Sequence, residues 1–435
     1  MKVCVFGLWH LGCVTAACLA ELGITVIGLD FDETVISTLK NSKAPIHEPW
    51  LNELIKKNLN TTISFSSDPA LALREADYLW VTFDTPVDTE DNADTQYVIS
   101  SIEKLYKYFS TDIKVIISSQ MLVGSTNKLR TDYNNNYVKN NVSFCYSPEN
   151  LRLGNAINIF MNPDRIIIGA DDIDRSKYEG LFLKISNNLE WMGIESAEMT
   201  KHAINAFLAT SVVFANEIAA ICEYVGADAK EVERGLKTEQ RIGKKAYVAP
   251  GSAISGGTLN RDIMFLDKLA NGCGLQVPLL KGVRTSNDLH KMWAKNKALE
   301  MLGDLNGKNI GILGLTYKPG TDTLRRSLSI ELCKELFLNK AIIYAYDPLV
   351  KTLDGEYSHF IKLREDVSQV FIGADCVILC TEWNDFKYCL SELNINKMKN
   401  KIVIDCCGFM LEEAKKLKGN LKYIALGSRQ NEASR

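Results

Sequence analysis

The stretch that decides the fold is Lys2-Val3-Cys4-Val5-Phe6-Gly7-Leu8-Trp9-His10-Leu11-Gly12. Residues 3–6 predict a buried strand, and the proline-free apolar residues 11–22 predict a helix. Between them, Gly7 and Gly12 occupy the first and third positions of a G-x-G-x-x-G loop. The first glycine permits the tight turn, and the third lets the helix pack on the sheet. The stretch therefore predicts a doubly wound α/β domain that binds a dinucleotide at a helix N-terminus.

The middle position of this loop is Trp9, where a glycine normally lets the backbone approach the pyrophosphate. Trp9 either bends the loop outward or covers the pyrophosphate with its ring, and the sequence leaves both readings open. The next predicted strand, residues 25–29, ends on Asp30, whose carboxylate can accept hydrogen bonds from an adenosine ribose. Asp30 favours NAD over NADP, because it would repel a 2′-phosphate. We expect NAD to contact Gly7, Trp9, His10, Leu11, Gly12 and Asp30.

Further short apolar runs repeat the strand pattern along the chain. They lie at residues 78–82, 115–118, 165–169, 309–315, 341–346, 376–380 and 401–405. Strands separated by helical stretches predict parallel sheets covered on both faces. We therefore predict two Rossmann-like domains, residues 1–195 and 301–435, on either side of a central helical domain at residues 196–300.

Residues 197–226 predict one long helix within the central domain. Its recurring apolar residues are Met199, Ala203, Ala206, Phe207, Val213, Phe214, Ile218 and Ile221. A helix of about 30 residues spans about 45 Å, which is more than a single domain needs. We expect this helix to join the domains and to offer a face for homodimerisation.

Composition excludes several classes of protein. The 435 residues are 46% apolar and 24% charged, and the formal charge of −3 gives no basic field for nucleic acid. The chain starts on a strand rather than a signal segment, and no apolar run approaches the roughly 20 residues that span a bilayer. The twelve cysteines show no repeated Cys-x-x-Cys spacing. We expect a cytoplasmic protein with reduced thiols, no metal site and no membrane or nucleic-acid partner.

Several segments, in order along essentially the whole chain, resemble the UDP-glucose/GDP-mannose 6-dehydrogenase family. They are residues 45–49, Thr85-Pro86 with Asp94, 147–154 with 162–165, 198–217, 241–243, Pro250-Gly251, 314–319 with Arg325, 346–348 and 381–383. The resemblance implies two NAD-dependent hydride transfers that take the C6 hydroxyl of a nucleotide-activated hexose, such as UDP-glucose, to a uronate. It also implies a place in polysaccharide precursor synthesis.

Four residues have catalytic roles that the resemblance implies. Lys201 and Asn205 lie four apart on one helix face, where an ammonium and an amide can stabilise an alkoxide or a tetrahedral adduct. Without the resemblance they would be a solvated lysine and a packing asparagine. Asp262 would orient water or relay a proton, although a lone aspartate at this position is more often a helix cap. Glu149 is a candidate general base for the hydrolytic step.

The remaining site residues are implied to bind. Additional cofactor contacts are Thr85, Pro86, Gln120, Arg261 and Arg325. Substrate contacts are Glu149, Asn150, Leu151, Arg152, Lys201, Asn205, Arg241, Gly251 and Lys318. Lys318 would pair with the nucleotide phosphates, and Arg241 would reach the sugar site of a partner subunit. The alternative for each of these cations is plain surface charge.

The sequence departs from the family where the chemistry takes place. Thr258 occupies the position of the nucleophilic cysteine, and Cys273, the nearest thiol in sequence, follows Asp262 and does not replace it. Ser119-Gln120 stands where the family has Ser-Thr, and Asp405-Cys406-Cys407 stands where it has D-x-R. A threonine hydroxyl without an adjacent base is a poor nucleophile.

Three outcomes of the reaction therefore stay open. They are full oxidation to the uronate by a cysteine-free route, release of the 6-aldehyde, and capture of that aldehyde by another nucleophile. An alternative from another class is a nucleotide-sugar-binding protein without catalysis.

Overall fold

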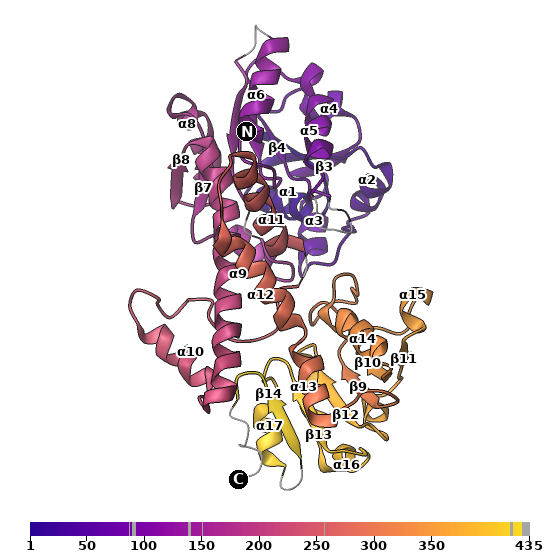
Figure 1. Cartoon of the computed structure of the whole chain (residues 1–435). Coiled ribbons are helices and arrows are strands. Elements are labelled where there is room, and N and C mark those ends of the chain that lie inside the picture. Colours follow the sequence, from indigo (N-terminus) through magenta and orange to yellow (C-terminus); the bar gives the residue numbers. More distant parts are fainter. Residues whose placement is uncertain are drawn as a thin grey trace. The chain divides into compact units, whose positions relative to one another are not determined.

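The computed structural model describes residues 1–86, 88, 93–137, 141–149, 151–255, 257–417 and 421–428. The chain divides into two units, residues 1–203 and 204–435, which are described separately (Figure 1).

Unit 1 is built on an eight-stranded sheet with the order β3-β2-β1-β4-β5-β6-β7-β8. The strands are β1 (Lys2–Phe6), β2 (Thr25–Leu29), β3 (Ile63–Ser66), β4 (Tyr78–Val81), β5 (Lys114–Ile117), β6 (Ser143–Tyr146), β7 (Ile166–Gly169) and β8 (Leu189–Met192). The order reverses direction between β1 and β4, which creates the crevice where doubly wound sheets bind ligands. Each strand predicted in this half of the chain is confirmed to within a few residues.

The first sheet is parallel, as predicted, except at one edge. β7 pairs antiparallel to β6, and β8 continues parallel to β7. Antiparallel neighbours are joined at the same edge of a sheet, so the connection from β6 returns at the carboxyl edge instead of crossing over. The described part of that connection, residues 147–149 and 151–165, is largely irregular and includes the short helix α7 (Ala156–Met161). It is also the segment that carries Glu149.

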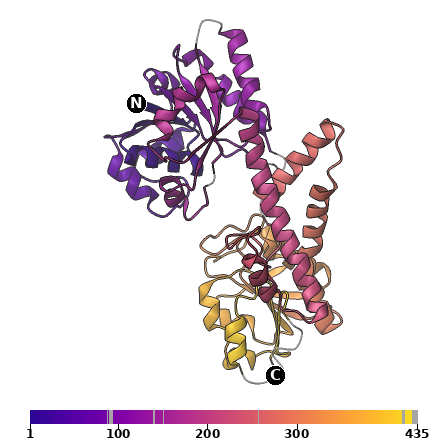
Figure 2. The same cartoon turned by 90° about the vertical axis from the view of Figure 1, so that its left-hand side faces the viewer.

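Helices cover both faces of the first sheet (Figure 2). They are α1 (His10–Glu21), α2 (Glu33–Lys40), α3 (Leu51–Asn58), α4 (Pro69–Leu73), α5 (Thr95–Glu103), α6 (Ser125–Asn136) and α8 (Arg175–Phe182). α1 packs on β1 and β2 and also contacts α3 and α7. Because it is enclosed by the sheet and these two helices, ten consecutive residues from Leu11 to Ala20 are buried.

The predicted long helix is confirmed as α9 (Ile194–Val225). By length and apolar composition alone it could span a membrane, but a core helix passes the same test. Buried charged and polar side chains on α9, among them Glu198 and His202, hydrogen-bond to protein groups, which is the pattern of a core helix. We therefore interpret α9 as a structural helix.

Unit 2 contains the helices α10 (Ala229–Thr238), α11 (Gly257–Gly272), α12 (Pro278–Lys291) and α13 (Trp293–Leu302). An apolar cluster joins α9 to α11 and α12, and its buried members are Ala206, Ala209, Val213, Ile263 and Val283. This packing fixes the side chains of α11 against α9.

The second sheet, also in unit 2, has the order β11-β10-β9-β12-β13-β14 and is parallel throughout. Its strands are β9 (Asn309–Leu313), β10 (Ile342–Tyr346), β11 (Ile361–Leu363), β12 (Cys376–Leu379), β13 (Ile402–Asp405) and β14 (Lys422–Ala425). Its helices are α14 (Leu328–Leu338), α15 (Gly355–Ser358), α16 (Glu392–Ile395) and α17 (Leu411–Lys416). Two apolar clusters that both draw on β9, β12 and β13 complete its core, which confirms the second Rossmann-like fold.

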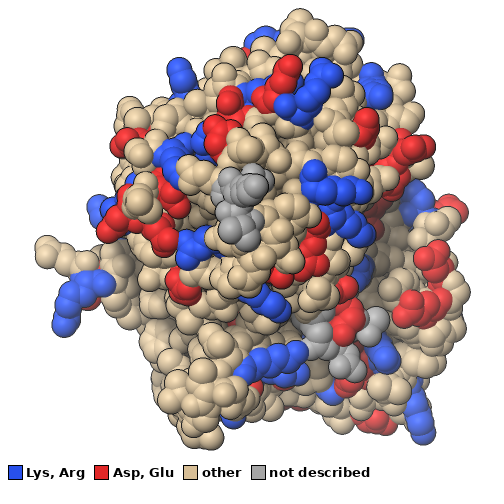
Figure 3. Space-filling view, turned by 90° about the horizontal axis from the view of Figure 1, so that it is seen from above, with Lys and Arg blue, Asp and Glu red and all other residues tan. Residues whose placement is uncertain are grey.

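Basic and acidic side chains are interspersed on the face of the molecule that Figure 3 shows. This distribution agrees with the small formal charge of the chain.

Candidate active site

The dinucleotide loop of unit 1 has the geometry that its glycines predict. Gly7 has a φ of 95°, and a Cβ there would lie 2.8 Å from the ring of Phe83. A Cβ on Gly12 would lie 1.9 Å from the carbonyl oxygen of Gly7. Trp9 has an ordinary φ of −99° and its side chain is 48% exposed. A tryptophan is therefore accommodated without the backbone strain that a positive φ would impose.

Asp30 follows β2 and faces this loop. Its Oδ2 accepts a hydrogen bond from the amide of Leu8 (2.7 Å), and its Oδ1 accepts one from the amide of Asp32 (3.0 Å). Each carboxylate oxygen has a second lone pair, so the partly exposed group can still accept from ribose hydroxyls. The first amides of α1 have no acceptor within the helix and suit a pyrophosphate. These features fit an NAD molecule.

Thr85 and Gln120, both predicted cofactor contacts, touch each other. The buried Thr85 hydroxyl donates to the carbonyl oxygen of Gln120 (2.6 Å), so it joins the ends of β4 and β5. Exposed Pro86 accepts a hydrogen bond from the amide of Asp94 (2.8 Å). Asp94 in turn caps α5 by accepting from the amide of Tyr97. The Thr-Pro…Asp motif thus shapes this loop.

Lys201 and Glu149 form an ion pair within unit 1. The buried Lys201 ammonium lies 3.4 Å from Oε1 of Glu149 and donates to its carbonyl oxygen at 2.5 Å. The second carboxylate oxygen of Glu149 accepts from the amide of Leu151 (2.6 Å). An ammonium has three donors. Among the described residues, the Lys201 ammonium contacts two oxygens of Glu149, so its third donor can bind a substrate oxygen.

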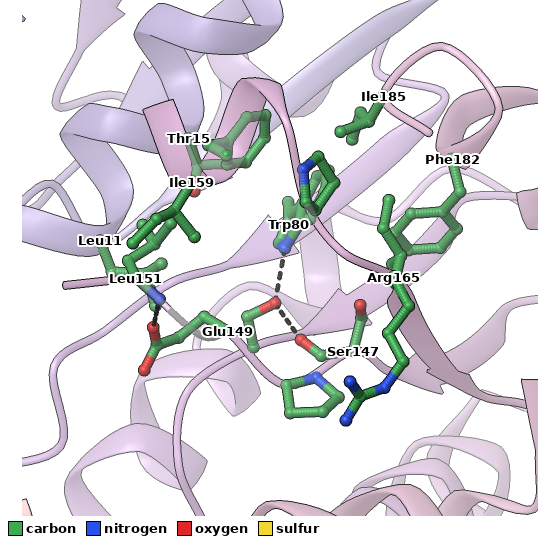
Figure 4. A pocket seen from close by; sticks show the side chains of 15 residues that line it. Leu11, Thr15, Trp80, Ser147, Glu149, Leu151, Ile159, Arg165, Phe182 and Ile185 are labelled. Carbon is green, nitrogen blue, oxygen red and sulfur yellow. Dashed lines mark hydrogen bonds between the residues drawn. The ribbon is translucent and has the colours of Figure 1, made fainter. Parts of the chain in front are cut away.

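A pocket of about 540 Å³, including its open mouth, lies beside Glu149 (Figure 4). On its floor, the indole N–H of Trp80 donates to Ser118 (2.8 Å), and the Ser118 hydroxyl donates to the carbonyl oxygen of Ser147 (2.5 Å). The sequence analysis did not identify this chain of contacts. Ser119, which follows Ser118 in the sequence, has a buried hydroxyl that makes no hydrogen bond within the described residues.

Glu198, one turn before Lys201 on α9, is a further residue that was missed. Its carboxylate accepts from the amides of Gly124 (2.5 Å) and Thr126 (2.9 Å) at the N-terminus of α6. Burial raises the pKa of Glu198, while these hydrogen bonds act in the opposite direction. Glu198 therefore anchors the helix segment that presents Lys201.

In unit 2, the side-chain amide of Asn205 donates to Oδ2 of Asp262. Asp262 is completely buried in the second turn of α11, so the helix-cap alternative is wrong. Cap residues precede the first turn, whereas Asp262 follows it. Lys201 and Asn205 lie one turn apart on α9, as predicted, and each is held by a carboxylate.

Thr258 is exposed in the first turn of α11. No basic side chain of the described residues hydrogen-bonds to it. Cys273 is the exposed cysteine among the twelve, but it follows the end of α11, about 22 Å along the helix axis from Thr258. Burial raises the pKa of the Cys407 thiol, whose sulfur lies 2.9 Å from the hydroxyl of Ser252.

Gly251, a predicted substrate contact, is held at both of its backbone groups. Its amide donates to Oδ1 of Asn216 (2.9 Å), and its carbonyl oxygen accepts from Nε2 of His290 (2.9 Å). His290 was not identified from the sequence, because its partner lies 39 residues away. Burial lowers the pKa of His290, and its Nε2 donates to the carbonyl oxygen because that oxygen can only accept.

The predicted binding cations are spread along the chain. Arg152, Arg241 and Arg325 are exposed, and Arg261 and Lys318 are partly buried. Arg241 pairs with Glu239 (2.9 Å) in its own segment. Arg325 lines an open pocket at the carboxyl edge of the second sheet together with Lys351. Asn150 lies outside the described residues.

The glycine loop, the carboxylate at the end of β2, and an ammonium and an amide on one helix define an NAD-dependent dehydrogenase of two Rossmann-like folds. Sequence profiles of the UDP-glucose/GDP-mannose dehydrogenase family match its NAD-binding domain at residues 1–184, its central domain at 195–289 and its UDP-binding domain at 311–412. The chain belongs to this family. It is an oxidoreductase that acts on a CH–OH group with NAD.

Relatives cover the whole chain. The UDP-glucose 6-dehydrogenase YwqF of Bacillus subtilis (strain 168) is 32% identical, and the match covers 98% of each chain. The UDP-glucose 6-dehydrogenase of Rickettsia conorii is 31% identical, over 99% of this chain and 100% of the relative. Among solved structures, a UDP-glucose dehydrogenase from the archaeon Pyrobaculum islandicum superposes with a TM-score of 0.85, at 26% identity and 98% coverage of each chain.

Proposed function

We propose that this protein oxidises the C6 hydroxyl of a UDP-glucose-like nucleotide sugar with NAD, and that the reaction stalls at the 6-aldehyde. The names of the relatives support the substrate, and Thr258 at the nucleophile position supports the stall. In this proposal the protein works in the cytoplasm and supplies precursors for polysaccharide synthesis.

The residues of the first oxidation are all present. NAD supplies the hydride acceptor when it is bound. Lys201 would stabilise the alkoxide that forms as the hydroxyl loses its proton, through the donor that Glu149 leaves unused. In unit 2, Asn205 has one amide hydrogen engaged by Asp262, so its second can bind a substrate oxygen. Asp262, which is completely buried, would hold or pass on the proton, directly or through water.

The second oxidation normally begins when a thiolate attacks the aldehyde. Thr258 offers an exposed hydroxyl with no histidine adjacent to it in the sequence, so its nucleophilic form is scarce at neutral pH. Attack by water would give an aldehyde hydrate, which can also lose hydride, and Glu149 is the candidate base for that step. Loss of covalent catalysis therefore favours accumulation of the aldehyde over rapid formation of the uronate.

The test is the number of NADH molecules formed per sugar in single-turnover reactions with UDP-glucose and a panel of other UDP- and GDP-hexoses. We expect one NADH in the fast phase, with an aldehyde that hydroxylamine traps. Two NADH in one fast phase would contradict the stall. Retained sugar binding with no NADH would identify a binding protein instead.

Thr258→Cys sharpens this test, because it restores a thiol at the start of α11. We expect the second NADH to appear in the fast phase of this variant. Thr258→Ser is the matched control, since it changes the side chain at the same position without adding a thiol. Cys407→Ala tests whether the thiol beside Ser252 contributes, and we expect no change in stoichiometry.

We also propose that the protein is a homodimer that associates through α9. Phe207, Phe214 and Ile221 are spaced by seven residues, so they lie along nearly the same stripe of the helix. Their side chains are 71%, 46% and 56% exposed. Exposed apolar stripes of this kind are typical of protein interfaces. In a dimer, the exposed Arg241 could serve the sugar site of the partner subunit.

Light scattering during size-exclusion chromatography tests the dimer. We expect twice the chain mass for the native protein and a monomer for Phe207→Lys with Ile221→Lys. A native monomer would overturn this proposal without affecting the first. Arg241→Ala is expected to leave the mass unchanged and to raise the KM for the sugar.

A further inference from the structure

Glu48 is a buried carboxylate to which the sequence analysis gave no role. It lies between α2 and α3 and is only 5% exposed. Its Oε2 is bound by Nε2 of His10 (2.9 Å) and by the amide of Gly154 (2.8 Å), and its Oε1 accepts from the amide of Ala156 (2.9 Å). Each of these groups donates to the carboxylate, so Glu48 joins three segments that are far apart in the sequence.

The two ends of this connection lie at different parts of the dehydrogenase machinery. His10 is the first residue of α1, and the N-terminus of that helix is where this fold holds a pyrophosphate. Gly154 and Ala156 follow Glu149, the partner of Lys201, in the sequence, and Ala156 is the first residue of α7. Gly154 has a φ of 91°, where any other residue would be strained.

A buried carboxylate has to keep its hydrogen bonds, because an unpaired charge in the interior is costly. The position of the His10 ring therefore restricts the position of Glu48, and Glu48 restricts the two amides. Contact of the cofactor with the first turn of α1 would fix the His10 ring, and this constraint would pass through Glu48 to the amides of Gly154 and Ala156. Conversely, a change in the positions of the Gly154 and Ala156 amides would change the affinity for NAD, because coupling free energies between two sites are reciprocal.

We propose that Glu48 is a positioning residue that couples NAD binding at the N-terminus of α1 to the positions of the Gly154 and Ala156 amides, with His10 as the link. NAD binding would then favour the arrangement in which Glu149 contacts Lys201. The proposal requires NAD binding but does not depend on the identity of the hexose or on the stall at the aldehyde.

Hydrogen–deuterium exchange of the Gly154 and Ala156 amides tests the coupling without any turnover. NAD is expected to slow their exchange by about fivefold or more in the native protein. In His10→Phe, measured at an NAD concentration that calorimetry shows to be saturating, the slowing should disappear. His10→Gln, whose amide can still donate to Glu48, should recover part of it.

Glu48→Gln should raise the exchange of both amides whether or not NAD is present, because a neutral amide oxygen is a weaker acceptor than a carboxylate. Glu33→Gln, an exposed position on α2, is the matched control and should behave like the native protein. Equal protection by NAD in the native protein and in His10→Phe would overturn the proposal, as would no protection in the native protein. If Glu48→Gln fails to fold, the two His10 variants still decide the question.

Discussion

The two Rossmann-like folds of this chain use the same local device for different purposes. In the first, Gly7 follows β1 with a positive φ, and the amide of the next residue, Leu8, donates to Asp30 after β2. In the second, Gly314 follows β9 with a φ of 89°, and the amide of Leu315 donates to Asp347 after β10. Each aspartate thus binds the turn that follows the first strand of its sheet.

The surroundings of the two aspartates separate their roles. Asp30 is partly exposed, and α1 begins three residues after Gly7, so helix amides and carboxylate lie ready for a dinucleotide. Asp347 is 1% exposed, and its Oδ2 is bound by Leu315, Thr316 and the indole of Trp383. The carboxylate of Asp347 in the second fold is therefore structural. The long 315–327 loop of this fold carries Lys318 and Arg325 instead.

The largest effect expected from this comparison is on stability. Asp347→Ala leaves the buried amides of Leu315 and Thr316 and the buried Thr316 hydroxyl without this acceptor, and each such group costs about 1–3 kcal/mol. We expect the free energy of unfolding to fall by about 3 kcal/mol or more, measured by urea denaturation followed by tryptophan fluorescence. Asp30→Ala, the matched variant in the first fold, should lose about 1 kcal/mol. Equal losses of unfolding free energy in the two variants would show that the two carboxylates contribute equally to stability.

For NAD binding we expect the opposite order, with the larger effect from Asp30→Ala. Asp30→Ala should weaken NAD binding by about 10- to 100-fold, because a hydrogen bond to a charged group contributes about 1.5–3 kcal/mol. The same variant should bind NADP relatively better, since the carboxylate no longer repels the 2′-phosphate. Calorimetric titration with both dinucleotides measures this. An unchanged ratio of NAD to NADP affinity would remove Asp30 from the ribose site.

Part of this comparison could be read from the sequence. The glycine turn and the strands around it depend on neighbouring residues and on apolar periodicity, and the structure confirms them, whereas the contact of Asp30 with a ribose stays a prediction. The long helix α9 was equally predictable, because 3.6-residue periodicity continues through it without a proline.

The missing parts depend on contacts between distant segments. Glu48 binds an amide 106 residues away, and nothing local to residues 45–49 distinguishes that role from a surface glutamate. The reversal of β7 was missed because residues 147–165 have little regular structure to indicate where the chain turns back. Asp347 resembles Asp30 in the sequence. Its burial and its hydrogen bond from the indole of Trp383, which show that protein groups occupy the carboxylate, appear only in the structure.

The unit that contains the second fold should also respond to pH through His290. Burial lowers the pKa of His290 from 6.5, so its contribution to stability is present above the pKa of the unfolded chain and is lost as pH falls below it. We expect the unfolding free energy to fall below about pH 6.5 by at most about 1.4 kcal/mol per pH unit from this group.

His290→Gln, which keeps a donor for Gly251, should flatten that part of the profile of urea midpoints against pH. The exposed His359 lies in the same unit, and His359→Gln should leave the profile unchanged. A native profile that is level between pH 7 and pH 5.5 would contradict the assignment to His290.

The smallest expected effect, on stability and on NAD affinity, concerns Trp9, which distinguishes the glycine loop of the first fold from an ordinary dinucleotide-binding loop. Trp9 precedes α1 without a side-chain cap and with an unstrained φ, so Trp9→Gly should change stability by less than about 0.5 kcal/mol. If the ring points away from the pyrophosphate, the NAD dissociation constant should stay within about threefold, which corresponds to about 0.7 kcal/mol. A loss of tenfold or more would instead place the indole over the cofactor. Calorimetry on this one variant therefore decides between the two readings of Trp9, and a small effect would show that a dinucleotide loop can lose its middle glycine while its backbone keeps an ordinary φ.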